Sequence, residues 1–345
     1  MKKTAYFVLL LLLAVLLVSC LRDAEPASPV QSEVMTEAES EKAATSAAEA
    51  TVATESETVT VTGSEPPTEP AWTEPVPDTE PVRTEPYVPS AAVSTNITSP
   101  AAAAALEKLE ADFSYMGDAA IYFATVDGKY SFGIRERDVY TSASTIKAPY
   151  CQYIIASGAD LDDTVYYGEN TRMSLEGVMA PEYVGNTYTV GQLIEYAIRY
   201  SDNQAYRLLY EKFGVDGFNE YLSSIGAAGL SLSEWSEFGH ASAAELSAAM
   251  LDIYRRSADD PTLLTYIENC VFSVQIAGGT PYVCAHKYGY DGGTEGFHDT
   301  AIVFHPAGAY LLTVMTHVDF DAYEDCSFFT AVTSHCDELM WALGG

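Results

Sequence analysis

The stretch TSASTIKAPY at residues 141–150 places a serine, Ser144, three positions before a lysine, Lys147. Side chains three residues apart on a helix project from the same face, with β-carbons about 5–6 Å apart. A serine hydroxyl needs an adjacent base to act as a nucleophile, and a lysine serves as that base when burial or a neighbouring cation lowers its pKa. Two alternatives follow: Ser144 and Lys147 are a nucleophile and its base, or they are a helix N-cap and a solvated surface lysine.

Two further short motifs follow along the chain. A Ser-Asp-Asn tripeptide lies at residues 201–203, and a Lys-Tyr-Gly tripeptide lies at residues 287–289. For the first of these alone, a helix cap is the structural alternative. The part of the chain after residue 100 has only five lysines, however, and two of them, Lys147 and Lys287, fall in the motifs. Taken as a set, the three motifs favour chemistry over capping.

The elements that must position these motifs follow from the hydrophobic spacing. The expected order is helix, two strands, several helices, three strands and a final helix, which is an α+β arrangement. The strands from both ends of the domain would share one five-stranded antiparallel sheet, packed with helices, and the intervening helices would form a second lobe. A cleft between a sheet edge and a helical lobe is a common ligand site. The elements are expected after Ser99-Pro100, at 119–126 and 129–134, 191–214, 242–256, 282–289, 300–305, 309–317 and about 321–343.

The three motifs resemble those of the active-site serine β-lactamase and penicillin-binding-protein superfamily, and specifically the class A β-lactamase-like catalytic domain. The signature of that family is Ser-x-x-Lys, Ser-Asp-Asn and Lys-Thr-Gly. The resemblance spans about residues 101–345 and includes the flanking segments GNTYTVGQLIEYAIRYSDNQAYRLL and AHKYG, with HDTAIV after it. It implies a β-lactamase/transpeptidase-like fold that works without a cofactor. The six histidines form no HExxH or comparable cluster, so no metal is expected.

The resemblance implies a catalytic role for four residues. Ser144 would be the acylated nucleophile, and Lys147 would be its base, with a pKa lowered by burial and by the nearby charge of Lys287. Ser201 would bridge the two lysines and pass a proton to the leaving nitrogen.

The family also implies residues that bind the substrate. Asn203 would orient Lys147 and hydrogen-bond the substrate, and Lys287 would attract a substrate carboxylate. Gly289 would let the substrate backbone approach the strand. By the same resemblance, the backbone N–H groups of Ser144 and Tyr290 would form the oxyanion hole.

Three departures from the family pattern bear on the reaction. Class A enzymes have a loop glutamate that activates the deacylating water, but GAAGLSLSEWSEFGHASAAEL has no Glu-x-x-Leu-Asn and offers only Glu234 and Glu237. Tyr288 replaces the Thr or Ser that helps to hold the substrate carboxylate. Residues 288–300 contain no Arg or Lys, which leaves His298 as the cation available there. An acyl-enzyme formed from a β-lactam would therefore persist, and carboxylate recognition would be altered.

The N-terminal part of the chain has a different composition. Residues 1–20 have the layout of a signal peptide, with a basic start, an apolar run too short for a comfortable transmembrane helix and the sequence LVSC. LVSC is similar to a bacterial lipobox, which predicts lipidation of Cys20; an ordinary signal peptide or an uncleaved anchor is the alternative. Residues 21–98 are rich in Glu, Thr, Ser, Ala and Pro, which predicts a disordered acidic linker. The domain at 99–345 is thus expected to be exported, membrane-anchored and extracytoplasmic.

The charge of the chain limits its partners. The formal net charge is −32, which argues against binding to nucleic acid or to anionic lipid surfaces, so that the membrane would be reached through the Cys20 anchor. A monomer is expected. The predicted function is a serine hydrolase that acts through a Ser144 acyl-enzyme on a β-lactam or a cell-wall-peptide-like amide, with D,D-peptidase-like or esterase activity included. The alternatives are a penicillin-binding-type or non-catalytic ligand-binding lipoprotein with slow or no deacylation, and a surface spacer or adhesin.

Overall fold

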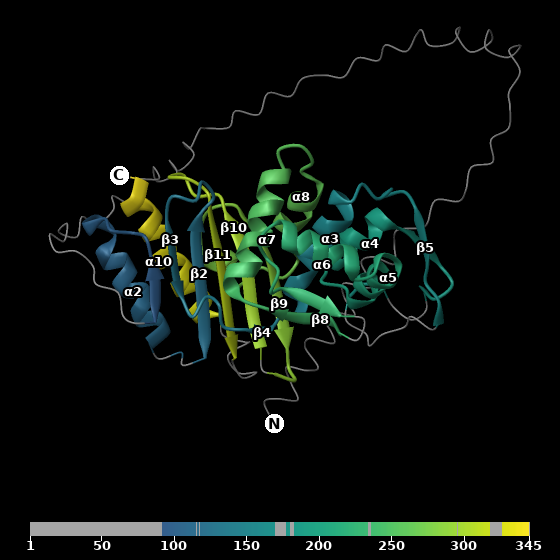
Figure 1. The fold of residues 1–345 in the computed structure, drawn as a ribbon, viewed down its shortest axis with the longest axis horizontal. Helices are drawn as coiled ribbons and strands as arrows, with labels where there is room; N and C mark the ends of the chain where they lie inside the picture. Colours follow the sequence, from purple (N-terminus) through teal and green to yellow (C-terminus); the bar gives the residue numbers. More distant parts are fainter. Residues whose placement is uncertain are drawn as a thin grey trace, which may run out of the picture. The chain divides into compact units, whose positions relative to one another are not determined.

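The computed structural model describes residues 92–114, 116, 118–169, 177–179, 183–233, 236–294, 296–317 and 326–344 (Figure 1). Cys20, Glu234, the predicted signal peptide and nearly all of the predicted linker lie outside these ranges, as does the start of the predicted terminal helix. Within the described ranges, no helix combines the length and the apolar character that a membrane span requires.

The central element is an antiparallel sheet with the strand order β1-β3-β2-β11-β10-β9. Its middle pairing joins the two ends of the domain, because β11 lies beside β2. This arrangement confirms the predicted α+β fold, in which early and late strands share one sheet. The strands are β1 (Val93–Thr95), β2 (Ala119–Thr125), β3 (Ser131–Ile134), β9 (Cys284–Asp291), β10 (Gly296–Val303) and β11 (Tyr310–His317).

The sheet has six strands, where the sequence predicted five. The additional strand, β1, pairs Val93 with Ile134 at the sheet edge and lies in the segment that was assigned to the linker. A three-residue strand with only one large apolar side chain gives too little alternation to be recognised. The late strands also differ in their bounds: β9 and β10 pair across a tight turn, with Lys287 opposite Thr300 and Gly289 opposite His298.

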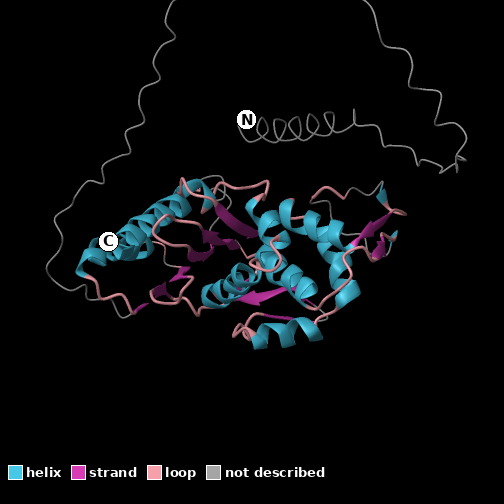
Figure 2. Cartoon of the chain, turned by 90° about the horizontal axis from the view of Figure 1, so that it is seen from above, coloured by secondary structure: helices cyan, strands magenta, loops and turns pink. Residues whose placement is uncertain are grey.

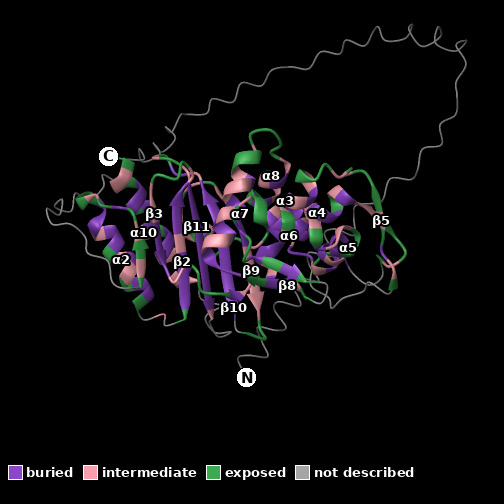
Figure 3. Ribbon diagram, in the orientation of Figure 1, coloured by how far each residue is buried: buried purple, intermediate pink, exposed green. Residues whose placement is uncertain are grey.

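Helices cover both faces of the sheet (Figure 2). On one face, α2 (Ala103–Ser114) and α10 (Ser327–Gly344) pack together and onto the strands. Leu106, Leu109 and Phe113 are buried there, as the spacing of these residues predicts. Full burial of each such side chain contributes about 1.5–3 kcal/mol relative to exposure. Figure 3 shows that the central strands are buried along their length, which agrees with coverage on both faces.

The second lobe consists mainly of helices. The predicted helical stretch at 191–214 is two helices, because the chain breaks between them at Ser201, whose φ is +53°. Asp202 then caps the second helix by accepting a hydrogen bond from the Ala205 N–H at 2.7 Å. The break places the Ser-Asp-Asn motif in a turn. The helices of the lobe are α3 (Lys147–Ala156), α4 (Val190–Arg199), α5 (Asn203–Phe213), α6 (Asp216–Ser224), α7 (Ala243–Arg256) and α8 (Thr262–Glu268).

Two small sheets complete the fold. β5 (Thr164–Tyr166) pairs with β6 (Thr187–Thr189), and β4 (Tyr140–Thr141) pairs with β8 (Ser236–Ala241), which in turn pairs with β7 (Ser231–Ser233). The β4–β8 pairing matters most for function. It brings strand β8, which contains Glu237, against the start of the Ser-x-x-Lys motif.

Candidate active site

The three motifs meet where strand β9, the α4–α5 turn and the start of α3 come together. The Lys147 ammonium donates to the Ser201 carbonyl oxygen at 2.7 Å and to Asn203 Oδ1 at 2.6 Å. The Lys287 ammonium donates to Ser201 Oγ at 2.9 Å, and Lys147 Nζ lies 3.4 Å from the same hydroxyl. The Ser201 side chain thus stands between the two lysines, which is the arrangement that the resemblance implies.

Ser144 lies in a short 3-10 segment, η2 (Ala143–Ile146), that leads directly into α3. Its side chain is partly exposed, whereas Thr145 and Lys147 are buried. The residue before it, Ala143, has a φ of +47°. This left-handed backbone conformation is unfavourable for any residue that has a β-carbon. Ser201 has the same kind of backbone strain, and such strain is typical of functional sites.

Gly289 has a structural role beside the predicted one. A β-carbon at this position would lie 3.0 Å from the backbone nitrogens of both Ser144 and Thr145. Only glycine therefore lets strand β9 approach η2 so closely. The family resemblance implies that this glycine lets the substrate approach, whereas its close neighbour in the structure is the segment η2 that contains Ser144.

Both lysines of the site are fully buried. Burial lowers the pKa of Lys287 to about 8, because the low-dielectric interior disfavours the charged ammonium. Lys147 Nζ lies 5.8 Å from the ring centroids of Tyr206 and Phe238, so aromatic rings form part of its surroundings. A lysine with a lowered pKa is partly neutral near pH 8, which allows it to exchange protons with Ser201.

Asp202 does more than cap a helix. Its Oδ2 accepts hydrogen bonds from the N–H groups of Val178 (2.6 Å) and Met179 (2.7 Å), while its Oδ1 caps α5. The carboxylate is fully buried. It therefore ties the segment at 177–179 to the turn that carries Ser201, a contact that the motif alone did not predict.

The candidate loop glutamate that the structure describes is engaged elsewhere. Glu237 lies on β8, and its Oε2 accepts a hydrogen bond from Arg207 Nη1 at 3.1 Å. Its neighbour Phe238 is the residue of β8 whose ring faces Lys147. Because strand residues alternate between faces, placing Phe238 toward the site directs Glu237 away from it.

The expected cation on β10 is not available to a substrate. His298 is fully buried, its Nδ1 accepts a hydrogen bond from the Thr316 N–H at 3.2 Å, and its ring packs edge-on against Tyr140. Burial lowers the pKa of His298 to about 4, so the ring is neutral at physiological pH. The expectation that His298 supplies a carboxylate-binding cation therefore does not fit the structure.

Tyr288 of the third motif and Tyr290, which follows the motif, differ in their surroundings. Tyr288 covers the neighbouring ammonium: Lys287 Nζ lies 4.2 Å from its ring centroid and donates to its carbonyl oxygen at 2.9 Å. Tyr290 is partly buried and packs edge-on against Phe297. The ring of Tyr288 also packs on Phe272, with the centroids 4.8 Å apart.

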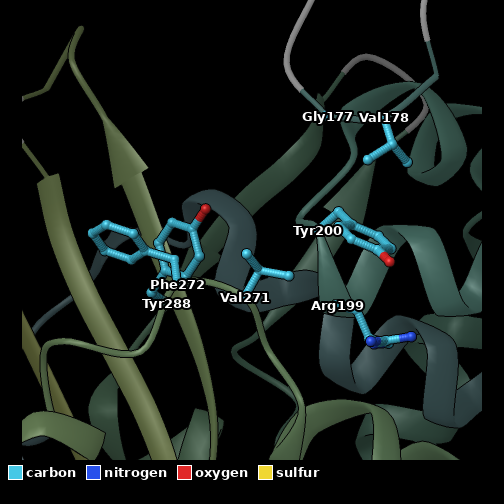
Figure 4. Close-up of a pocket in the computed structure, with 7 residues that line it drawn as sticks. All are labelled: Gly177, Val178, Arg199, Tyr200, Val271, Phe272 and Tyr288. Carbon is cyan, nitrogen blue, oxygen red and sulfur yellow. The ribbon is translucent and has the colours of Figure 1, made fainter. Parts of the chain in front are cut away.

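A cavity of about 210 Å³ opens beside Tyr288 (Figure 4). Val271 and Phe272 belong to the loop between α8 and β9, which contains none of the motifs, so their part in the cavity could not be predicted from the motifs. The cation at this cavity is Arg199, whose Nη1 is paired with Glu195 Oε1 at 2.5 Å. The cavity is lined by Val178, Arg199, Tyr200, Val271, Phe272 and Tyr288.

The described residues hold neither a disulfide nor a recognisable metal site. Within these ranges, Cys151, Cys270, Cys284 and Cys336 are free thiols. Over the same part of the chain, no group of three His, Cys, Asp or Glu side chains is arranged to hold a metal ion.

Comparison with known proteins gives relatives of one kind. The β-lactamase SME-1 of Serratia marcescens is 27% identical over 139 residues, which cover 39% of this chain and 46% of the relative. The β-lactamase ROB-1 of Haemophilus influenzae is 30% identical over 118 residues, or 32% of this chain and 37% of the relative. The chain thus spans less than half the length of these curated relatives.

Solved structures extend the likeness to nearly whole domains. The structure of PBP-A has a TM-score of 0.60 at 18% identity and covers 68% of this chain and 95% of its own. An ancestral class A β-lactamase has a TM-score of 0.59 at 21% identity and covers 68% of this chain and 99% of its own. These likenesses show the fold. Residues 101–338 match the Beta-lactamase enzyme family, and the chain belongs to that family, as its motifs predicted.

Proposed function

We propose that the protein is a serine hydrolase that forms an acyl-enzyme at Ser144 with a β-lactam or a cell-wall-peptide-like amide and releases it slowly. The observation that carries this proposal is the position of Ser201 Oγ, 2.9 Å from Lys287 Nζ and 3.4 Å from Lys147 Nζ. One hydroxyl between two buried lysines provides a short route for a proton. A solved mutant of PBP-A, which has a similar fold, is an acyl-enzyme complex with penicillin G.

In the acylation step, Ser144 Oγ attacks the amide carbonyl carbon while Lys147 in its neutral form takes the hydroxyl proton. The new O–C bond forms as the C–N bond breaks. Ser201 then donates its proton to the leaving nitrogen and is reprotonated from the lysines on either side. The lowered pKa of Lys287 supports this relay, because both its neutral and its charged forms are populated near pH 8.

Slow deacylation is supported by the groups that lie on the side of Lys147 away from Ser201 and Lys287. Hydrolysis of the ester needs a base that activates a water molecule. The Glu237 carboxylate is paired with Arg207, and the rings of Tyr206 and Phe238 lie beside Lys147. Among the described residues on this side of Lys147, these contacts leave no carboxylate directed at the site, which favours a long-lived acyl-enzyme. A long-lived acyl-enzyme is the behaviour of a penicillin-binding protein rather than of an efficient β-lactamase.

The experiment is intact-mass spectrometry of the protein during incubation with millimolar penicillin G. We expect one adduct per chain in the wild type and in Ser224→Ala, which removes an exposed serine of α6, and none in Ser144→Ala. An adduct that survives in Ser144→Ala, or the absence of any adduct in the wild type, would contradict the proposal.

We also propose, from the sequence of residues 1–20, that the chain is exported and lipid-anchored at Cys20. Metabolic labelling with an alkynyl fatty acid should mark the full chain but not a Cys20→Ser variant. Equal labelling of the two chains would overturn this assignment.

A further inference from the structure

The cavity beside Tyr288 adjoins the proposed proton relay on two sides. Tyr288 directly follows Lys287, and Tyr200 directly precedes Ser201, and both side chains line the cavity (Figure 4). In the proposed acylation step, Ser201 delivers the proton to the leaving group. The cavity therefore lies on the leaving-group side of the scissile bond.

Backbone hydrogen bonds fix the walls of this cavity to the elements that carry the site. The Val271 N–H donates to the Arg199 carbonyl oxygen at 2.9 Å, which holds the loop before β9 against the end of α4. On the other wall, the Val178 N–H donates to Asp202 Oδ2 at 2.6 Å. Each wall is thus tied to the immediate neighbourhood of Ser201, so that the cavity is formed without a substrate.

Most of the cavity lining is apolar, and its polar groups are the Arg199 guanidinium and the hydroxyls of Tyr200 and Tyr288. Val178 and Val271 are 39% and 64% exposed. The rings of Phe272 and Tyr288 pack against each other. Exposed aliphatic and aromatic side chains that converge on one small cavity offer burial to an apolar group of about the size of a phenyl ring.

The cations near the cavity are engaged, which disfavours an anionic ligand. The Lys287 ammonium is fully buried, donates to Ser201 and lies beneath the Tyr288 ring. The Arg199 guanidinium is paired with Glu195 through Nη1, and its Nε, which has no hydrogen-bond partner among the described residues, is buried and so not exposed to a ligand in the cavity. The formal net charge of −32 adds a repulsive field for anions.

We propose that this cavity is a leaving-group subsite for an uncharged apolar substituent, aromatic or branched aliphatic, where related enzymes receive a carboxylate. This inference rests on the proposed acyl-enzyme function. It predicts that a substrate is acylated faster when the carboxylate on its leaving-group side is replaced by an apolar ester.

The test compares penicillin G with its benzyl ester, because the two probes share the β-lactam ring and the leaving nitrogen and differ at that carboxylate. The second-order rate constant for formation of the Ser144 adduct is measured by intact mass. For the wild type, we expect the benzyl ester to react about tenfold faster or more, the order of selectivity that an apolar pocket provides.

Two matched variants locate the preference. Val271→Lys places a cation at the cavity and should reduce or invert the preference for the ester. Val139→Lys, at a position directly before β4 with a similar exposure of 66%, should leave the preference unchanged. Since Val271 is 64% exposed, the substitution is compatible with folding, which an unchanged Tm confirms.

The outcomes separate this inference from the function on which it rests. Equal or faster reaction of penicillin G in the wild type overturns the subsite while the acyl-enzyme function stands. An unchanged preference in Val271→Lys also overturns it. If neither probe gives a Ser144-dependent adduct, the proposed function fails and the subsite fails with it.

Discussion

The two sides of Lys147 differ in kind. On one side, its ammonium donates to the Ser201 carbonyl oxygen and to Asn203 Oδ1. The Ser201 hydroxyl on this side accepts a hydrogen bond from Lys287 of strand β9. On the side of the β7–β8 hairpin, it meets the rings of Tyr206 and Phe238. We call these the polar side and the aromatic side. In the proposed reaction, the polar side supplies the groups for acylation. The aromatic side has rings in the place of a base that deacylation would need. The two proposed half-reactions therefore depend on different elements.

The largest expected effect comes from removing the base on the polar side. Lys147→Ala should slow adduct formation with penicillin G by roughly 10²–10⁴-fold, the range typical for loss of a general base. Lys212→Ala, which removes an ion-paired surface lysine of α5, should leave the rate unchanged. Rates are measured by intact mass under pseudo-first-order conditions, and similar losses in both variants would remove Lys147 from the mechanism.

A carboxylate introduced on the aromatic side should restore the missing half-reaction. We expect Phe238→Glu to speed decay of the penicillin adduct by about 10²-fold, because the new carboxylate can activate water beside Lys147. Ser236→Glu, at an exposed position of the same strand, is the matched control and should not change the decay. Decay that stays at the wild-type rate in Phe238→Glu would mean that something other than the missing base makes the adduct persist.

Asp202 tests whether the polar side depends on its buried anchor. Asp202→Ala removes a helix cap and leaves the N–H groups of Val178 and Met179 without their acceptor, so the free energy of unfolding should fall by about 3 kcal/mol. Asp260→Ala removes one exposed hydrogen bond to the Thr262 N–H and should cost about 0.5 kcal/mol. Urea denaturation measures both values, and equal values would contradict the structural role of Asp202.

The pH dependence of stability tests the burial of Lys287. Burial lowers the pKa of Lys287 from 10.5 to about 8, so between these values the unfolded chain binds a proton that the folded chain does not. The unfolding free energy of the wild type relative to Lys287→Met should therefore rise with pH from about 8 to 10.5, by up to about 1.4 kcal/mol per unit, and be flat below pH 8. A difference that does not change with pH would show that Lys287 keeps an ordinary pKa.

The sequence predicted the polar side well, because three short motifs carry it. The structure joins Lys147, Ser201, Asn203 and Lys287 by hydrogen bonds and places the backbone of Ser144 against Gly289 of the same strand as Lys287. The α+β fold was also predictable, since amphipathic helices and alternating strands carry strong periodic signals.

The remaining features depend on contacts between segments that are distant in sequence, which no local sequence pattern predicts. The helix break at Ser201 follows from a strained backbone and a buried cap, not from hydrophobic spacing. The aromatic side and the cavity arise where Phe238, Val271 and Phe272, far apart in sequence from the motifs, pack against them. His298 looked like an available cation because its burial could not be read from residue type alone.

The most direct test of the central claim is the lifetime of the Ser144 acyl-enzyme. The penicillin adduct is formed, free penicillin is removed by desalting, and the mass of the protein is followed over time. We expect the adduct to decay much more slowly than it forms, so that deacylation limits turnover. Decay as fast as formation would instead show an efficient β-lactamase, and would contradict the assignment of the aromatic side.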